Sequence, residues 1–239
     1  MITEVSKDKL AAVGVRFNSG ALSEQAGYTL GIAALDGEGI QDLLPGGFIG
    51  EVNDALSKVG DARNDKTLIG AEAKEATKTQ NSAFSQSKVW RRKVAKRAAN
   101  ALEMGTSVPD GLVKISKART MPALQTQMTE MVSLLEANLA RLPGKGLAEL
   151  LEEGKSLEKA LRTADAEQEV KRFRELPEKV IDFYYYKGLL YTGLKMINNA
   201  GHALHAENPV ASGRYNMDIL HRRGGIRSTG QADQKDTAT

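Results

Sequence analysis

The spacing of apolar residues predicts that helices occupy most of the chain. Between Phe48 and Leu102, apolar side chains recur mostly at steps of three and four, the period of an α-helix. The positions are Phe48, Val52, Ala55, Leu56, Val59, Ala62, Ile69, Ala73, Ala76, Ala83, Val89, Trp90, Val94, Ala98, Ala101 and Leu102. No proline occurs from Gly46 to Val108, and a proline inside a helix would cost about 3 kcal/mol. We therefore predict one helix over 48–104, ended by Gly105. The polar stretch 63–82 could be a break in this helix or a solvent-bridging stretch of it.

Two later stretches show a sharper, heptad-like pattern. One consists of Met121, Leu124, Met128, Met131, Leu135, Asn138 and Leu142, and the other of Phe173, Leu176, Val180, Phe183, Lys187, Leu190, Leu194, Ile197, Gly201 and Leu204. In both stretches, steps of three and four alternate, as in helices that bury one stripe against their neighbours. We expect one helix after Pro109, with Asp110 as its cap, and another from Leu147 that kinks or restarts near Pro177. A short helix over 210–222 follows.

The N-terminal residues differ from the rest because they are rich in glycine. Glycine destabilises a helix interior by roughly 0.5–1 kcal/mol, and the glycines here are Gly14, Gly20, Gly27, Gly31, Gly37, Gly39, Gly46, Gly47 and Gly50. Short helices are expected over 4–18 and 22–35, with Ser6 and Ser23 as N-caps. The predicted organisation is a mobile Gly-rich segment with short helices over 1–47, a long-helix bundle over 48–223 and a flexible polar tail over 224–239.

The composition favours an all-α fold. Hydrophobic residues make up 41% of the chain and aromatic residues only 5%. Thin side chains such as alanine and leucine suit close packing between helices better than a sheet sandwich. A helix of roughly 50 residues would be about 75 Å long. The predicted architecture is therefore an elongated antiparallel helical bundle with long coiled-coil-like helices.

Charged residues separate into two blocks, although the net charge is only +3. The segment 76–102 contains cations but no acid, and the segment 149–169 is rich in acids. The candidate interaction residues are Lys88, Arg91, Arg92, Lys93, Lys96 and Arg97, here called the basic block, and Glu149, Glu152, Glu153 and Glu158, here called the acidic block. The two blocks could pair within one chain or between copies. The basic block could instead track nucleic-acid phosphates or meet anionic lipid. The plainer interpretation is a solvated charged face.

Signals of catalysis are weak in this sequence. The absence of cysteine rules out disulfides and thiolate metal sites. His202 and His205, with Glu207 beyond them, loosely match a metal-ligand spacing, but the dipole of a helix C-terminus accounts for them more simply. The Gly144-Lys145-Gly146 turn lacks the spacing of a P-loop, and neither GxSxG nor HExxH occurs. We expect no enzymatic activity, no cofactor, no bound metal and no small-molecule substrate.

Two short segments carry a resemblance to known proteins. They are Gly14-Val15-Arg16-Phe17-Asn18-Ser19-Gly20 and the run from Asn208 to Arg223, which contains Tyr215-Asn216-Met217-Asp218-Ile219-Leu220. These segments resemble the two ends of a group of uncharacterised bacterial helical proteins that close with an aromatic-Asn-x-Asp-Leu-Leu-x-Arg run. The resemblance implies no activity. Asn216 and Asp218 are expected to act as local caps or turn partners.

Three functions compete on this pattern. The leading hypothesis is a non-enzymatic structural or assembly protein that acts through helix-bundle surfaces, as a homo-oligomer or within a larger protein assembly. One alternative is a nucleic-acid-binding accessory protein that uses the basic stripe 88–97. The other is a membrane-active helical protein that inserts the Gly-rich segment 26–50, although Asp36, Glu38 and Asp42 argue against deep insertion.

The expected location is the cytoplasm. Met1 to Leu10 carries four charged residues and lacks the apolar run of a Sec-type signal peptide. No uncharged apolar run approaches the roughly 20 residues that a membrane helix needs. Export by a route other than Sec stays open.

Overall fold

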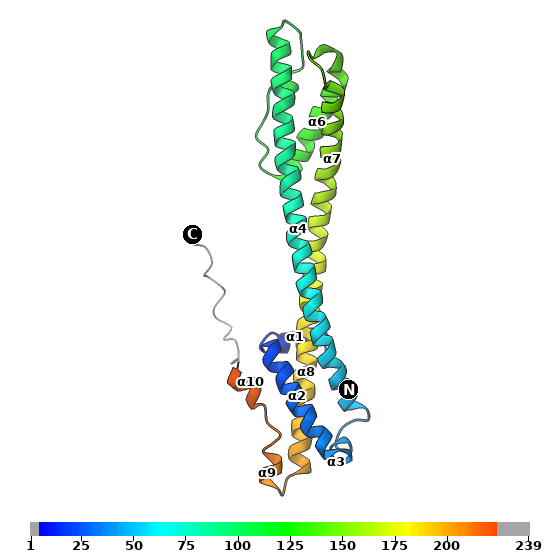
Figure 1. Cartoon of the computed structure of the whole chain (residues 1–239), viewed down its shortest axis with the longest axis vertical. Helices are drawn as coiled ribbons and strands as arrows, with labels where there is room; N and C mark the ends of the chain where they lie inside the picture. Colours follow the sequence, from blue (N-terminus) through cyan, green and yellow to red (C-terminus); the bar gives the residue numbers. More distant parts are fainter. Residues whose placement is uncertain (1–4, 224–239) are drawn as a thin grey trace. The chain divides into compact units, whose positions relative to one another are not determined.

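The computed structural model describes residues 5–223, and every regular element in that range is helical (Figure 1). The elements are α1 (Lys7–Gly14), α2 (Ser19–Asp36), α3 (Glu38–Gln41), α4 (Phe48–Glu103), α5 (Asp110–Val113), α6 (Met121–Asn138), the 3₁₀ turn η2 (Leu139–Arg141), α7 (Leu147–Glu169), the π-helical segment η3 (Val170–Glu175), α8 (Leu176–Leu204), α9 (Pro209–Ser212) and α10 (Asp218–Arg223). The predicted all-α class is confirmed. The predicted polar tail 224–239 lies outside the described residues.

The chain folds into two compact units. The first unit combines residues 1–68 with residues 177–239, and the second unit is Ile69–Leu176. Helix α4 therefore contributes its beginning to the first unit and the remainder to the second. The sequence placed a boundary between residues 47 and 48, whereas the two units meet at 68/69 and at 176/177. No boundary falls at residue 47 because the glycine-rich N-terminal helices share a core with the start of α4 and with α8.

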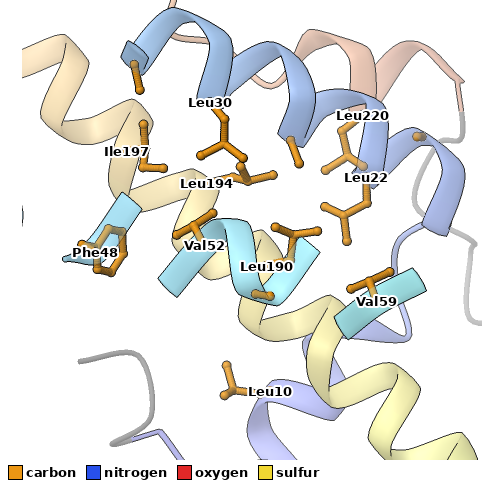
Figure 2. Close-up of a cluster of buried hydrophobic side chains, with 14 of the residues drawn as sticks. Leu10, Leu22, Leu30, Phe48, Val52, Val59, Leu190, Leu194, Ile197 and Leu220 are labelled. Carbon is orange, nitrogen blue, oxygen red and sulfur yellow. The ribbon is translucent and has the colours of Figure 1, made fainter. Parts of the chain in front are cut away.

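The core of the first unit joins side chains from both ends of the sequence (Figure 2). Leu10 of α1, Leu22 and Leu30 of α2, and Val52 of α4 are buried together with the α8 residues Leu190 and Leu194 and with Leu220 of α10. Burying a leucine or valine side chain stabilises a fold by about 1.5–3 kcal/mol relative to exposure. The Gly-rich segment is thus packed where the sequence indicated mobility.

The packing of α2 explains that difference. Gly27 and Gly31 both lie on its exposed side, where an added Cβ atom would meet nothing within 4 Å. Ala26, Leu30 and Ala33 form the buried side. Since the glycines fall on the solvent side, they weaken the intrinsic helix propensity without interrupting the apolar face.

Helices α1 and α8 pack at glycines. A Cβ atom on Gly188 of α8 would overlap the carbonyl oxygen of Leu10, and a Cβ atom on Gly14 of α1 would overlap the carbonyl oxygen of Tyr184. Only glycine lets two helix backbones approach this closely. Lys7 of α1 also pairs with Asp182 of α8 at 2.5 Å.

The second unit has its own core, centred on Trp90. The indole is completely buried, donates from Nε1 to the carbonyl oxygen of Leu150 at 2.8 Å, and lies against Gly154 of α7. The heptad pattern of α6 is confirmed, because Leu124, Met128, Met131, Leu135, Asn138 and Leu142 are buried and Met121 is partly buried. The Asn138 amide donates to the carbonyl oxygen of Leu134, so the polar position of the pattern is satisfied within its own helix.

The predicted single long helix is confirmed, and several local details differ from the predictions. Helix α4 continues through 63–82 without a break, because alanine, glutamate and lysine keep the helix propensity of this polar stretch high. Val89 and Leu102 are 45% and 43% exposed, so the apolar pattern included two surface positions. The predicted short helix over 210–222 is instead α9 and α10, separated by a turn at Gly213–Met217.

The remaining differences concern helix ends. The predicted cap Asp110 is instead the first residue of the short helix α5, and α6 begins only at Met121, after the non-helical segment 114–120. The N-cap of α2 is Asn18, whose side-chain oxygen accepts from Gly20 N and Ala21 N, so this helix begins before the predicted Ser23. Ser6 occupies the N-cap of α1 without a side-chain hydrogen bond. Phe173 is 68% exposed, because it lies in η3, where the wider π-helical turn shifts residues out of the register of α8.

Candidate functional site

The structure divides the basic block between two sides of α4, all within the second unit. On one side, Lys88, Arg91 and Arg92 line a pocket with the segment that precedes α6. On the other side, Lys93 pairs with Glu153 of α7 at 3.0 Å, and Arg97 donates to the carbonyl oxygen of Lys145 at 3.0 Å. Lys96 is exposed and forms no ion pair among the described residues. The single stripe expected from the sequence is therefore two sites.

The first of these sites is a pocket of about 630 Å³, here called the basic pocket. Its lining consists of Lys88, Arg91 and Arg92 of α4 and of Ile115, Ser116, Lys117, Ala118 and Arg119. Five of these eight residues are cationic and none is acidic. Ile115 and Ala118 give the pocket an apolar wall, and the Lys88 ammonium lies 4.0 Å from the centre of the Phe84 ring.

Arg91 is the unusual member of the basic pocket. Its side chain is 4% exposed, whereas Arg92 and Lys93 are exposed. One terminal nitrogen donates to the carbonyl oxygen of Ser116 at 3.3 Å, and the buried Nε has no hydrogen-bond partner. Burial lowers the pKa of Arg91, and the charge of Glu130 opposes this shift. Charge reversal at Arg91 would thus affect folding as well as any surface contact.

The acidic block is paired mainly with its own neighbourhood. Glu158 accepts from Thr129 at 2.7 Å and pairs with Arg162 at 2.8 Å. Glu152 lies 3.7 Å from Lys155, while Glu149 is exposed without an ion pair among the described residues. Within the described part of the chain, Lys93–Glu153 is thus the ion pair that joins the two blocks.

A second polar cluster, in the first unit, was not predicted from the sequence. Asp36 at the end of α2 accepts from the Tyr215 hydroxyl at 2.5 Å and lies 2.7 Å from His205 Nε2. The hydrogen bond from Tyr215, followed by the one from His205, lowers the pKa of Asp36. Burial and the hydrogen bond to Asp36 raise the pKa of Tyr215. His202 instead contacts the Ser212 hydroxyl at 2.8 Å, so the two histidines have separate partners.

The C-terminal run that carries the resemblance is anchored to α2. The Gln25 amide nitrogen donates to the carbonyl oxygen of Asn216, and its oxygen accepts from the backbone nitrogens of Ile219 and Leu220 at the start of α10. The Tyr215 ring fills the space above Gly201, where a Cβ atom would overlap it. The turn role expected of Asn216 is confirmed, because its side chain accepts from Asp218 N and donates to the Gly213 carbonyl oxygen.

Asp36→Asn should destabilise the first unit by about 1–3 kcal/mol at pH 7, because it removes the charged acceptor of a buried hydroxyl. A depressed carboxyl pKa contributes its stability in full above the ordinary value of 3.8, and that contribution is lost as the pH falls through the lower folded value. The difference between wild type and Asp36→Asn should therefore shrink between pH 7 and pH 3. Urea unfolding at several pH values measures it, with the exposed Asp42→Asn as control. A difference independent of pH would contradict this assignment.

Comparisons with known proteins assign no family to the chain. No protein-family model matches the chain, and neither a curated protein nor a solved structure shows significant similarity to it. Among residues 5–223, no group of three or more His, Asp or Glu side chains is arranged to hold a metal ion. No described helix combines the length and apolar character needed to cross a membrane.

Proposed function

We propose that the protein is a non-enzymatic assembly protein that associates with copies of itself through oppositely charged strips on its second unit. The observation that carries the proposal is the incomplete pairing of the two charge blocks. One ion pair, Lys93–Glu153, joins them within the described chain, while Lys96, Glu149 and Glu152 are exposed and Glu152 lies 3.7 Å from Lys155 of its own helix. In this proposal, Lys93 and Lys96 of α4 form a positive strip, and Glu149 and Glu152 of the neighbouring α7 form a negative strip.

Adjacent strips of opposite sign make a surface complementary to itself. A two-fold axis parallel to the strips would place the positive strip of each copy on the negative strip of the other. Such an arrangement fixes the register between copies and repels misaligned partners. Exposed charge pairs are individually weak, at about 0–1 kcal/mol, so the association should depend on several pairs and on ionic strength.

We further propose that the helices of the second unit form an antiparallel, coiled-coil-like bundle. Contacts between α4 and α7 support it, because Gln80 of α4 bonds to Asp165 of α7 and Lys93 of α4 bonds to Glu153 of α7. A residue later in α4 thus contacts a residue earlier in α7, as in antiparallel helices. Contacts between α6 and α7 follow the same rule, at Thr129–Arg162 and Glu136–Lys155. The alternating steps of the α6 pattern also suit this packing.

Charge reversal tests the self-association. Variant A carries Lys93→Glu and Lys96→Glu, and variant B carries Glu149→Lys and Glu152→Lys; all four residues are exposed. In sedimentation velocity at low salt, each variant alone should stay monomeric, because like charges face each other. An equimolar mixture of A and B should associate again, and high salt should dissociate wild type and the mixture alike.

The matched control reverses two exposed cations outside the basic block, Lys74→Glu and Arg141→Glu. It changes the net charge as variant A does and should leave wild-type association intact. Wild-type protein that is monomeric at every salt concentration would contradict the proposal. If instead variant A loses binding to DNA or RNA while its association matches that of wild type, the basic block serves nucleic acid.

The membrane-active alternative receives less support. Ala26, Leu30, Ala33, Ile40 and Phe48, which would have to enter a bilayer, are all buried in the core of the first unit. Their release would expose that core. Leakage of a dye from vesicles, measured beside the association experiments, tests this alternative directly.

A further inference from the structure

The basic pocket has a chemical character that self-association does not use. Lys88, Arg92, Lys117 and Arg119 line the pocket together with the buried Arg91, and no carboxylate lines it. Its volume of about 630 Å³ falls within the roughly 300–1,000 Å³ typical of small-molecule sites. The charged strips of the proposed assembly surface involve other residues, namely Lys93, Lys96, Glu149 and Glu152.

The state of Arg91 indicates that an anion belongs in this pocket. The side chain is more than nine-tenths buried, its Nε has no hydrogen-bond partner, and no ion pair involves it among residues 5–223. A buried charge without a direct ion-pair partner is strongly destabilising, and the charge of Glu130 opposes only part of the effect of burial on Arg91. Among the described residues, its guanidinium makes one hydrogen bond, to the Ser116 carbonyl oxygen, and this bond is long at 3.3 Å. The guanidinium therefore retains capacity for a charged acceptor.

Phosphate fits this lining better than a carboxylate. Guanidinium groups bind phosphate oxygens through paired, charge-assisted hydrogen bonds. A group with two negative charges and three free oxygens can engage several cations at once, whereas a single carboxylate would leave most of them unmatched. The exposed Ile115 and the buried Ala118 offer an apolar surface beside the cations.

We propose that the basic pocket binds a phosphorylated small molecule, with the phosphate held by Arg91, Arg92 and Arg119 and the apolar or planar part of the ligand against Ile115 and Ala118. This site is independent of the proposed self-association. It also differs from the expectation of no small-molecule ligand, which rested on sequence motifs alone.

Isothermal titration in phosphate-free buffer tests the site with two probes, ATP and inorganic pyrophosphate. Wild type should bind them with one site per chain. The variant Lys117→Gln with Arg119→Gln changes two exposed residues of the pocket and should weaken binding at least tenfold. The matched control, Arg141→Gln with Lys145→Gln, removes the same charge from two exposed positions of the second unit outside the pocket and should bind within twofold of wild type.

A third probe separates the sources of phosphate. Vesicles containing phosphatidic acid present the same group on a lipid, and pocket-dependent binding to them in place of ATP would identify a lipid headgroup as the ligand. The site would be overturned if ATP, pyrophosphate and the vesicles all failed to bind at millimolar concentrations of the phosphate group that they carry. Equal weakening in both double variants would also overturn it, because it would mean attraction by net charge alone. An oligonucleotide that binds while ATP does not would assign the cations to nucleic acid instead.

Arg91→Met supplies a second readout that does not depend on the exposed residues. Methionine fills similar space without a charge, so in phosphate-free buffer this variant should melt at the same temperature as wild type or higher. The rise in melting temperature that ATP gives to wild type should be lost. A variant that melts lower than wild type without ATP, yet keeps the ATP-dependent rise, would show that Arg91 supports the fold rather than a ligand.

Discussion

Leu190→Ala should lower the free energy of unfolding of the first unit by about 2–5 kcal/mol, and Leu194→Ala should do the same. Both side chains are completely buried on α8, among residues of α2 and of the beginning of α4 (Figure 2). Truncation removes favourable burial and leaves a cavity that a close-packed core closes only in part.

Urea unfolding followed by circular dichroism measures the effect. Lys195→Ala on the same helix is the matched control, because Lys195 is exposed and should change the free energy of unfolding by no more than about 0.5 kcal/mol. Equal losses at Leu190 and Lys195 would mean that the buried face of α8 has been misassigned.

Gly188→Ala should destabilise the first unit by more than about 2 kcal/mol, although it adds a single methyl group. The new Cβ atom would overlap the carbonyl oxygen of Leu10, and a backbone atom cannot move aside as a flexible side chain can. Helix α1 would have to shift away from α8, which would also strain the Lys7–Asp182 ion pair. Protection of the α1 amides against hydrogen exchange should fall first.

Gly60→Ala is the matched control for this substitution. Gly60 lies on the exposed side of α4 and has nothing within reach of an added Cβ atom. Alanine has the higher helix propensity, so this variant should be more stable by roughly 0.5–1 kcal/mol. The same chemical change would then have opposite signs at two helical positions. A loss of stability at Gly60 as large as that at Gly188 would contradict the proposed contact.

The sequence predicted those parts of the fold that depend on local periodicity. The bounds of α4 and the buried positions from Phe183 to Gly201 follow from the spacing of apolar residues, because each turn of a helix repeats the same environment. The glycines near the N-terminus led to a wrong prediction of mobility there. Helix propensity reflects the conformational freedom of the backbone and does not tell which side of a helix faces the core. Phe173 was misplaced because one π-helical turn changes the register without any sign in the spacing.

The candidate site was harder to predict because its two walls come from separate segments. Spacing identified the cations of α4, yet it could not tell that Arg91 faces inward while Lys93 and Lys96 face solvent. The second wall had a signal in the sequence, since no acid occurs between Gly111 and Thr129 although Lys114, Lys117 and Arg119 do. That signal became informative only once tertiary structure placed the segment beside α4.

The first unit is built from both ends of the sequence, with the whole second unit between its parts, and this has a consequence for synthesis on the ribosome. Leu22, Leu30 and Val52 emerge early, but Leu190, Leu194 and Leu220, which cover them, are translated only after the second unit. At about 5–20 residues per second, the delay lasts on the order of ten seconds. During that time the apolar side of α2 is open to chaperones and to neighbouring nascent chains, whereas the second unit, continuous in sequence, can already fold.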